Sequence, residues 1–246
     1  MNLKRYSIRL AYNGGKYHGW QRQLNAHSVQ EEIESTLSKL YGQQHYGVIG
    51  CGRTDTGVHA KDFVLHVDLP DTLTTERLKF KLNRMLSDDI VIFEVAEAAP
   101  EFHARFDAKK RTYRYFIHRQ KDPFRHEQSL YVPGELDMSA MNEAAKHFLG
   151  KQDFTSLSKL HTDVNNNFCE VYGSKWVEED ESRAYFEISA NRFLRNMVRA
   201  TVGILLDVGQ GRTRVEEVPK ILEAKDRQAA STSVAAKGLF LWEIEY

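Results

Sequence analysis

Apolar and polar side chains alternate along residues 6–12, and this period of two limits the fold more than any other feature. Tyr6, Ile8, Leu10 and Tyr12 fall on one side of the segment, which is the pattern of a half-buried β-strand. Similar strand-like segments follow in both halves of the chain, at residues 48–51, 63–67, 90–95, 112–118, 169–177, 184–190 and 240–246.

Helix signals lie between these strands. Ser28 is followed three residues later by Glu31, which is the pattern of a capping box at a helix start. The helix starts predicted further along the chain are Thr74 or Thr75, a position just after Asp137, and about Phe193, with the last helix running to Leu206. Because the strands cluster instead of alternating strictly with helices, we expect an α+β fold with antiparallel sheets.

The length of the chain and its charge set further limits. A chain of 246 residues suits two domains of about 100–150 residues each, and we place them at residues 1–104 and 105–246. Lys and Arg number 34, as do Asp and Glu, so the formal net charge is zero. The charge of the whole chain therefore does not indicate a nucleic-acid partner, and any basic surface must be local.

Cysteine usage and hydropathy indicate the compartment. Two cysteines, Cys51 and Cys169, are too few for a multi-cysteine zinc site or a disulfide framework. No signal peptide precedes the first strand-like segment, and no apolar run is long enough to span a bilayer. We therefore expect a cytoplasmic protein with no membrane association and no metal.

The segment Gly52-Arg53-Thr54-Asp55-Thr56-Gly57-Val58-His59-Ala60 is the sharpest local feature. Its glycines permit positive φ angles and close backbone approach, so a loop of this kind can present Arg53 and Asp55 at a cleft. The same residues also suit a tight turn in which Asp55 and Thr54 bond to their own backbone. Nearby His59 and His66 could act as general bases or could be satisfied core histidines.

A second segment, residues 102–126, mixes basic and aromatic side chains. Aromatic residues are interleaved with cations, and the cations are Arg105, Lys109, Lys110, Arg111, Arg114, Arg119, Lys121 and Arg125. Cations neutralise phosphates, and aromatic faces can stack on unpaired bases. The segment could equally be a solvated amphipathic strand whose aromatic residues lie in the core.

A third segment places Arg192, Arg195 and Arg199 at spacings of three and four residues. If the segment is helical, the three arginines form one stripe. Such a stripe could bind phosphates or hold a carboxylate through bidentate bonds, or it could simply be an exposed helix face.

Taken in order, these segments resemble the tRNA pseudouridine synthase A family. The residues 52–59 match the family's catalytic loop closely. Further matching segments follow in the family's order, and they include Ala11-Tyr12-Asn13-Gly14, Gly19-Trp20-Gln21-Arg22-Gln23, Phe102-His103-Ala104-Arg105-Phe106, Tyr113-Arg114-Tyr115 and Phe193-Leu194-Arg195-Asn196-Met197-Val198-Arg199.

The resemblance implies a fold, an assembly and a substrate. It implies two domains, each with an antiparallel sheet and flanking helices, around a central basic active-site cleft. It also implies a homodimer that binds the anticodon arm of tRNA and isomerises uridines 38, 39 and 40 without a cofactor.

The resemblance also implies roles for individual residues. Asp55 would be the nucleophile or the base, Arg199 would form an ion pair with it, and Tyr113 would stack on the target uracil. Arg53 would help displace the target base, and the remaining implied tRNA-binding residues are Lys109, Lys110, Arg111, Arg114, Arg192 and Arg195. Two alternatives are a tRNA-binding or chaperone protein that has no turnover and a metal-dependent phosphoesterase using Asp55, for which the loop offers no further carboxylates.

Overall fold

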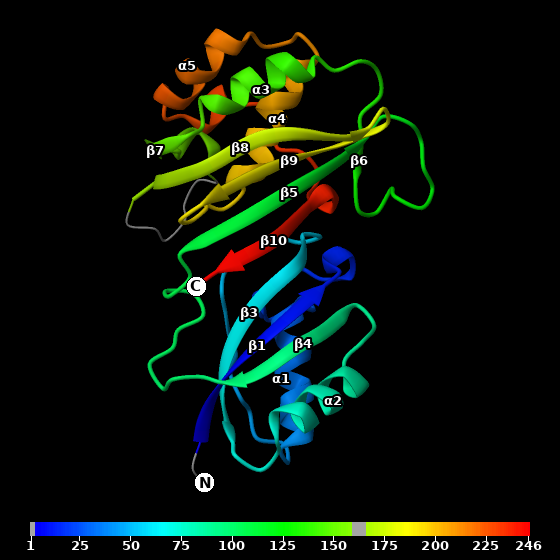
Figure 1. The fold of residues 1–246 in the computed structure, drawn as a ribbon, viewed down its shortest axis with the longest axis vertical. Helices are drawn as coiled ribbons and strands as arrows, with labels where there is room; N and C mark the ends of the chain where they lie inside the picture. The colour runs from blue at the N-terminus through cyan, green and yellow to red at the C-terminus, as the bar shows by residue number, and fades with distance from the viewer. Residues whose placement is uncertain (1–2, 159–165) are drawn as a thin grey trace. The chain divides into compact units, whose positions relative to one another are not determined.

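A computed structural model describes residues 3–158 and 166–246 of the chain. The chain divides into two compact units (Figure 1). Unit 1 comprises Met1–Lys109 and Leu241–Tyr246, and unit 2 comprises Lys110–Phe240. The last residues of the chain therefore group with the first hundred, which a division of the sequence at a single position does not anticipate.

Unit 1 is built on antiparallel strands with β1 (Leu3–Tyr12) between β3 (His59–Pro70) and β4 (Ile90–Glu97). The short strand β2 (Ile49–Gly50) also pairs with β3. The last strand, β10 (Leu239–Glu245), neighbours β3 on its other side. The period of two along β1 is confirmed, because Tyr6, Ile8, Leu10 and Tyr12 are all buried.

Two helices in unit 1 begin at the predicted caps. The α1 helix (Val29–Leu40) starts after Ser28, whose hydroxyl accepts the Glu31 backbone N–H. The α2 helix (Thr75–Met85) starts after Thr74, whose side chain accepts the Arg77 N–H. Val29, Ile33 and Leu37 are fully buried along one face of α1, as their helical spacing predicts.

Unit 2 has an antiparallel sheet in the order β5 (Lys110–His118), β9 (Arg183–Ala190), β8 (Phe168–Asp180) and β7 (Gly150–Asp153). The two-residue strand β6 (Leu130–Tyr131) joins β5 in parallel. The helices α3 (Met138–Lys146), α4 (Met197–Gly209) and α5 (Val218–Glu223) are gathered together beside this sheet (Figure 1). The predicted content of helices and mainly antiparallel strands is thus present in both units.

The start of α4 corrects the sequence prediction. The helix begins at Met197 and not near Phe193, because Asn196 has a left-handed backbone with φ of 70°. Residues 194–197 instead form a turn that the Met197 N–H closes on the Leu194 carbonyl. The predicted helical stripe of arginines is therefore wrong. Arg199 lies on α4, whereas Arg192 and Arg195 precede the helix.

Candidate functional site

The loop that carries Arg53 and Asp55 joins β2 to β3 and is held in place by the segment 14–20. The Trp20 N–H donates to the Thr54 carbonyl at 3.2 Å, and the Gly57 N–H donates to the Tyr17 carbonyl at 3.3 Å. Asp55 is half-buried, and Arg53 is exposed. The loop is thus a fixed part of unit 1, and its backbone bonds extend beyond a local turn to a segment more than thirty residues away in sequence.

Two glycines allow this contact between backbones. A β-carbon at Gly14 would lie 1.9 Å from the Val58 carbonyl oxygen, and one at Gly19 would lie 2.4 Å from the Thr54 carbonyl oxygen. Gly19 also has φ of 85°, a backbone conformation that other residues rarely adopt. The two segments can therefore lie together only because these positions carry no side chain.

Aromatic side chains pack against the loop that carries Asp55. The Tyr12 hydroxyl lies 2.9 Å from the Thr54 hydroxyl. Trp20 is 2 % exposed and stacks on Phe63, with ring centroids 4.1 Å apart. A β-carbon at Gly50 would lie 2.7 Å from both rings. The loop thus rests on close-packed rings, which limit its movement.

The two histidines near the loop are core residues in this structure. His59 Nδ1 accepts the Gly14 N–H at 3.1 Å, and His66 Nδ1 accepts the Ala104 N–H at 3.0 Å. Both side chains are buried. Each ring therefore accepts a hydrogen bond from a buried backbone N–H group. Of the two roles considered from the sequence, general base or satisfied core histidine, these contacts match the second.

The N-terminus of α1 docks on the same segment. The first helical N–H groups have no partner within a helix. Here the Val29 and Gln30 N–H groups donate to the carbonyls of Gly19 and Trp20, at 3.3 Å and 3.0 Å. The helix start, the segment 14–20 and the Asp55 loop are consequently joined by backbone hydrogen bonds.

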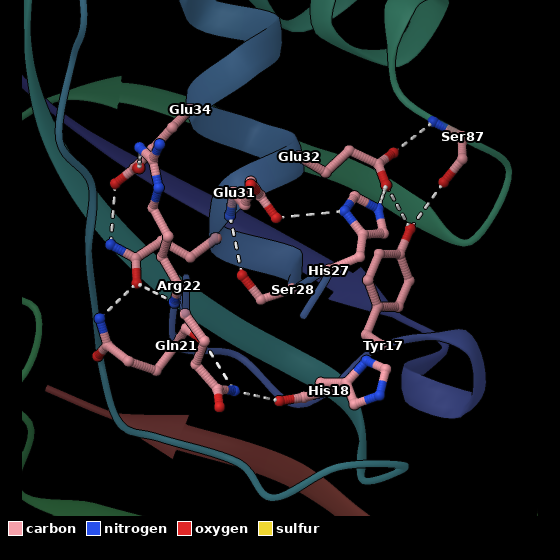
Figure 2. Close-up of polar contacts among 12 residues, drawn as sticks. Tyr17, His18, Gln21, Arg22, His27, Ser28, Glu31, Glu32, Glu34 and Ser87 are labelled. Atoms are coloured by element: carbon pink, nitrogen blue, oxygen red, sulfur yellow. Dashed lines mark hydrogen bonds and ion pairs between the residues drawn. The ribbon is translucent and has the colours of Figure 1, made fainter. Parts of the chain in front are cut away.

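A network of buried, half-buried and exposed polar side chains holds the other side of this segment (Figure 2). Glu32 of α1 accepts the Tyr17 hydroxyl at 2.7 Å and the Ser87 N–H at 3.0 Å, and it lies 3.1 Å from His27 Nε2. Burial by itself would raise the pKa of Glu32, but the hydrogen bonds from Tyr17, Ser87 and His27 lower it overall. An ionised Glu32 therefore anchors Tyr17, whose carbonyl holds the loop.

In unit 2, the alternation of β5 separates the predicted basic residues. Arg111 and Tyr113 lie on one face, and Lys110 and Arg114 lie on the other. Tyr113 is half-buried and meets the Phe193 ring edge-on at 5.0 Å between centroids. The Arg111 guanidinium donates to the Asn191 carbonyl at 2.8 Å. Arg111 and Tyr113 are thus both in contact with the segment 191–193, which precedes α4.

Arg114 has a different environment on the opposite face. Its Nε donates to Glu187 at 2.7 Å on the neighbouring strand, and its guanidinium lies 4.4 Å from the Tyr185 ring centroid. Lys109 is exposed just before the strand, and Lys110 is half-buried. The carboxylate of Glu187 therefore offsets part of the positive charge that the sequence alone suggests for this segment.

Arg199 is bonded to residues 231–235, a segment that no sequence pattern connects with it. Its Nε donates to the Val234 carbonyl at 2.7 Å, while the Asn196 side chain donates to the Ser233 hydroxyl at 2.6 Å. Arg227 also donates to Ser233, at 2.8 Å. Residues 231–235 thus form a strap across α4, and the contact is close, because a β-carbon at Gly203 would lie 2.4 Å from the Thr232 carbonyl oxygen.

Tyr115 links this strap to β5. Its hydroxyl donates to the Ala235 carbonyl at 2.7 Å. Burial raises the pKa of Tyr115, and the nearby Arg199 guanidinium opposes that rise. The structure therefore brings Arg199 and β5 together within unit 2. No sequence motif marks Ser233 for this role, because it lies 37 residues from Asn196, whose side chain donates to it.

Among residues 3–158 and 166–246, no three side chains of His, Cys, Asp or Glu come together in a way that could hold a metal ion. In the same part of the chain, no helix is both long and apolar enough to cross a membrane.

Comparison with known proteins identifies the family. The family model described as tRNA pseudouridine synthase matches residues 144–246. A tRNA pseudouridine synthase A from Parabacteroides distasonis is 46 % identical over 245 residues, covering 99 % of this chain and 96 % of the relative. The synthase A of Bacteroides thetaiotaomicron is 47 % identical, covering 99 % and 91 %. That of Listeria monocytogenes is 38 % identical, covering 99 % and 100 %. This chain therefore belongs to the tRNA pseudouridine synthase A family.

Proposed function

We propose that this protein is an enzyme that isomerises uridine to pseudouridine at positions 38, 39 and 40 in the anticodon arm of tRNA. The observation that carries the proposal is identity of 46–47 % to synthases of this name along nearly the whole of both chains. The alternative of a tRNA-binding or chaperone protein without turnover is not favoured, because these relatives are named as enzymes.

The reaction is an isomerisation, so its atoms balance without a co-substrate. The N1–C1′ bond of the target uridine breaks, the base turns while it is still held, and C5 forms the new bond to C1′. A uridine inside a stacked arm must first be extruded, which costs a few kcal/mol. Arg53, exposed on the loop, would help to displace the base.

Asp55 is the proposed catalytic residue. Its carboxylate would either attack the sugar or remove the C2′ proton, and both roles require the ionised form. Arg199 would form an ion pair with Asp55 and favour that form. Tyr113 would stack on the uracil, so that the detached base is retained while it turns.

We also propose the finer features that the resemblance implies. These are two domains around a basic cleft, cytoplasmic location, a homodimer, and phosphate contacts from Lys109, Lys110, Arg111, Arg114, Arg192 and Arg195. Arg111 shares its face of β5 with Tyr113, so it is the member of the strand best placed to act beside the target nucleotide.

The proposal is tested by mapping pseudouridine in an unmodified tRNA after incubation with the pure protein. Asp55→Asn removes the negative charge while keeping the shape of the side chain. Turnover is expected to fall below detection, while affinity for tRNA stays within about tenfold, since binding rests on many phosphate contacts. Glu94→Gln, the same chemical change at an exposed position of β4, should remain active. Substantial turnover by Asp55→Asn would exclude the catalytic assignment.

A further inference from the structure

Arg53 is a long, exposed side chain, and it is held by a neighbour outside its own loop. Its Nε donates to Gln21 Oε1 at 3.0 Å, across 32 residues of sequence. A hydrogen bond at Nε restrains the orientation of a guanidinium group, because Nε is part of that planar group. The orientation of Arg53 consequently depends on which atom of the Gln21 amide faces it.

The Gln21 amide is itself oriented by a second amide. Gln21 Nε2 donates to Gln30 Oε1 at 2.8 Å, and the same oxygen accepts the Arg22 backbone N–H at 3.0 Å. Gln30 Nε2 in turn donates to Glu34 Oε1 at 2.9 Å and to the Val48 carbonyl at 3.1 Å. With its nitrogen committed to Gln30, Gln21 presents its oxygen to Arg53.

The chain of amides ends on a buried carboxylate. Glu34 is 3 % exposed and accepts the Val48 N–H at 3.1 Å, the Gln30 amide and the Arg22 guanidinium at 3.1 Å. Gln30 and Glu34 are one helical turn apart on α1, so the helix sets their spacing. Figure 2 shows Gln21, Arg22 and Glu34 within one continuous set of contacts.

We propose that Gln21 is a positioning residue for base displacement, because it forms the end of a hydrogen-bonded relay from Glu34 through Gln30 that holds Arg53 in one orientation. This inference rests on the proposed function. Ordering a side chain with many rotamers costs free energy during binding. Because the relay orders the Arg53 side chain when the protein folds, this free energy is not lost again when the nucleotide binds.

The test compares two anticodon-arm substrates, one with the target uridine paired and one with it mismatched. A residue that assists extrusion matters less when the base is already unpaired. Gln21→Ala is therefore expected to lower the single-turnover rate on the paired substrate by about threefold to tenfold, the size that ordering one such side chain implies, and to approach the wild-type rate on the mismatched substrate.

Two further variants separate positioning from general damage. Arg53→Ala combined with Gln21→Ala should be no slower than Arg53→Ala alone, because Gln21 acts only through Arg53. Gln21→Glu keeps an acceptor for Arg53 and should retain more of the paired rate than Gln21→Ala. Gln23→Ala, in the same loop but bonded to the His18 carbonyl, should show the same relative rate on both substrates.

The outcomes are distinct. Equal defects of Gln21→Ala on both substrates, additive defects in the double variant, or a paired-substrate defect in Gln23→Ala would each overturn the relay. If the wild-type protein forms no pseudouridine on either substrate, the proposed function fails instead. Circular dichroism and tRNA affinity of Gln21→Ala, both expected to match the wild type, show that the variant is folded.

Discussion

At the scale of single residues, His66 shows how a buried ring couples folding to pH. It is 3 % exposed and packs against Phe102 and His103, with centroids 6.1 Å and 4.9 Å away. Its Nδ1 accepts the Ala104 N–H, so a proton on Nδ1 would remove that bond. Burial, the charge of Arg5 and the neighbouring His103 together lower the pKa of His66 to about 4.

The expected consequence is a loss of stability in mild acid. In the unfolded chain a histidine titrates near pH 6.5, so between that pH and about 4 the unfolded state binds a proton that the folded state does not. The free energy of unfolding should therefore fall as pH drops, by up to about 2 kcal/mol at pH 5 relative to pH 7.5. Urea midpoints at the two pH values measure this change.

His66→Asn provides the comparison. The Asn oxygen can accept the Ala104 N–H without titrating, so the variant should lose less stability between pH 7.5 and 5 than the wild type. The exposed His45→Asn should leave the pH dependence of the wild type in place. An equal pH dependence in His66→Asn and the wild type would show that His66 does not cause it.

At the scale of elements, the Asp55 loop is shaped by what lies beneath it. Helix α1, the segment 14–20 and the loop are joined by backbone hydrogen bonds. Since the backbones touch at Gly14 and Gly19, a change in the supporting segment should move the loop without altering any residue on it.

Gly14→Ala tests this contact. The added methyl group would lie 1.9 Å from the Val58 carbonyl oxygen, so the loop must shift. Crowding of this kind costs about 1–3 kcal/mol, and turnover should fall with it. Gly47→Ala is the matched control, because the nearest atom to its new methyl group, on His45, is 3.9 Å away. If urea midpoints and turnover are the same for the two variants, the loop does not depend on this contact.

At the scale of the whole molecule, a chain with zero net charge must bind a polyanion through a local surface. The alternation of β5 places Lys110 and Arg111 on opposite faces, so only part of the basic segment can meet one run of phosphates. We therefore expect fewer phosphate contacts than the number of cations in the sequence suggests.

A triple variant, Lys109→Ala with Lys110→Ala and Arg111→Ala, should make tRNA binding less sensitive to salt. One or two lost contacts would reduce the slope of log Kd against log salt by roughly 0.7–1.8. The control removes Arg77, Lys79 and Lys81 from α2 and should leave the slope near that of the wild type. An unchanged slope in the first variant would mean that the segment is structural.

The homodimer is a second expectation at this scale. Homo-oligomers most often have two-fold symmetry, and the family resemblance implies a dimer here. Light scattering at micromolar concentration should therefore give about twice 28.4 kDa. A protein that modifies tRNA as a clean monomer would contradict it.

Local patterns in the sequence determined the strands, most helix starts and the family. Alternation along β1 and the caps at Ser28, Thr74 and Asp137 predicted elements that the structure contains, because these signals involve neighbours within a few residues. The loop containing Asp55 could be recognised for the same reason, since its residues are contiguous.

Tertiary structure decided how those residues are held. The left-handed Asn196 moved the start of α4 and removed the arginine stripe, although the local pattern favoured a helix. The bonds from Arg53 to Gln21, from Arg199 to Val234 and from Gly14 to His59 join positions far apart in sequence. Local propensity contains no information about such pairs, because they form only when packing brings distant segments within hydrogen-bond distance.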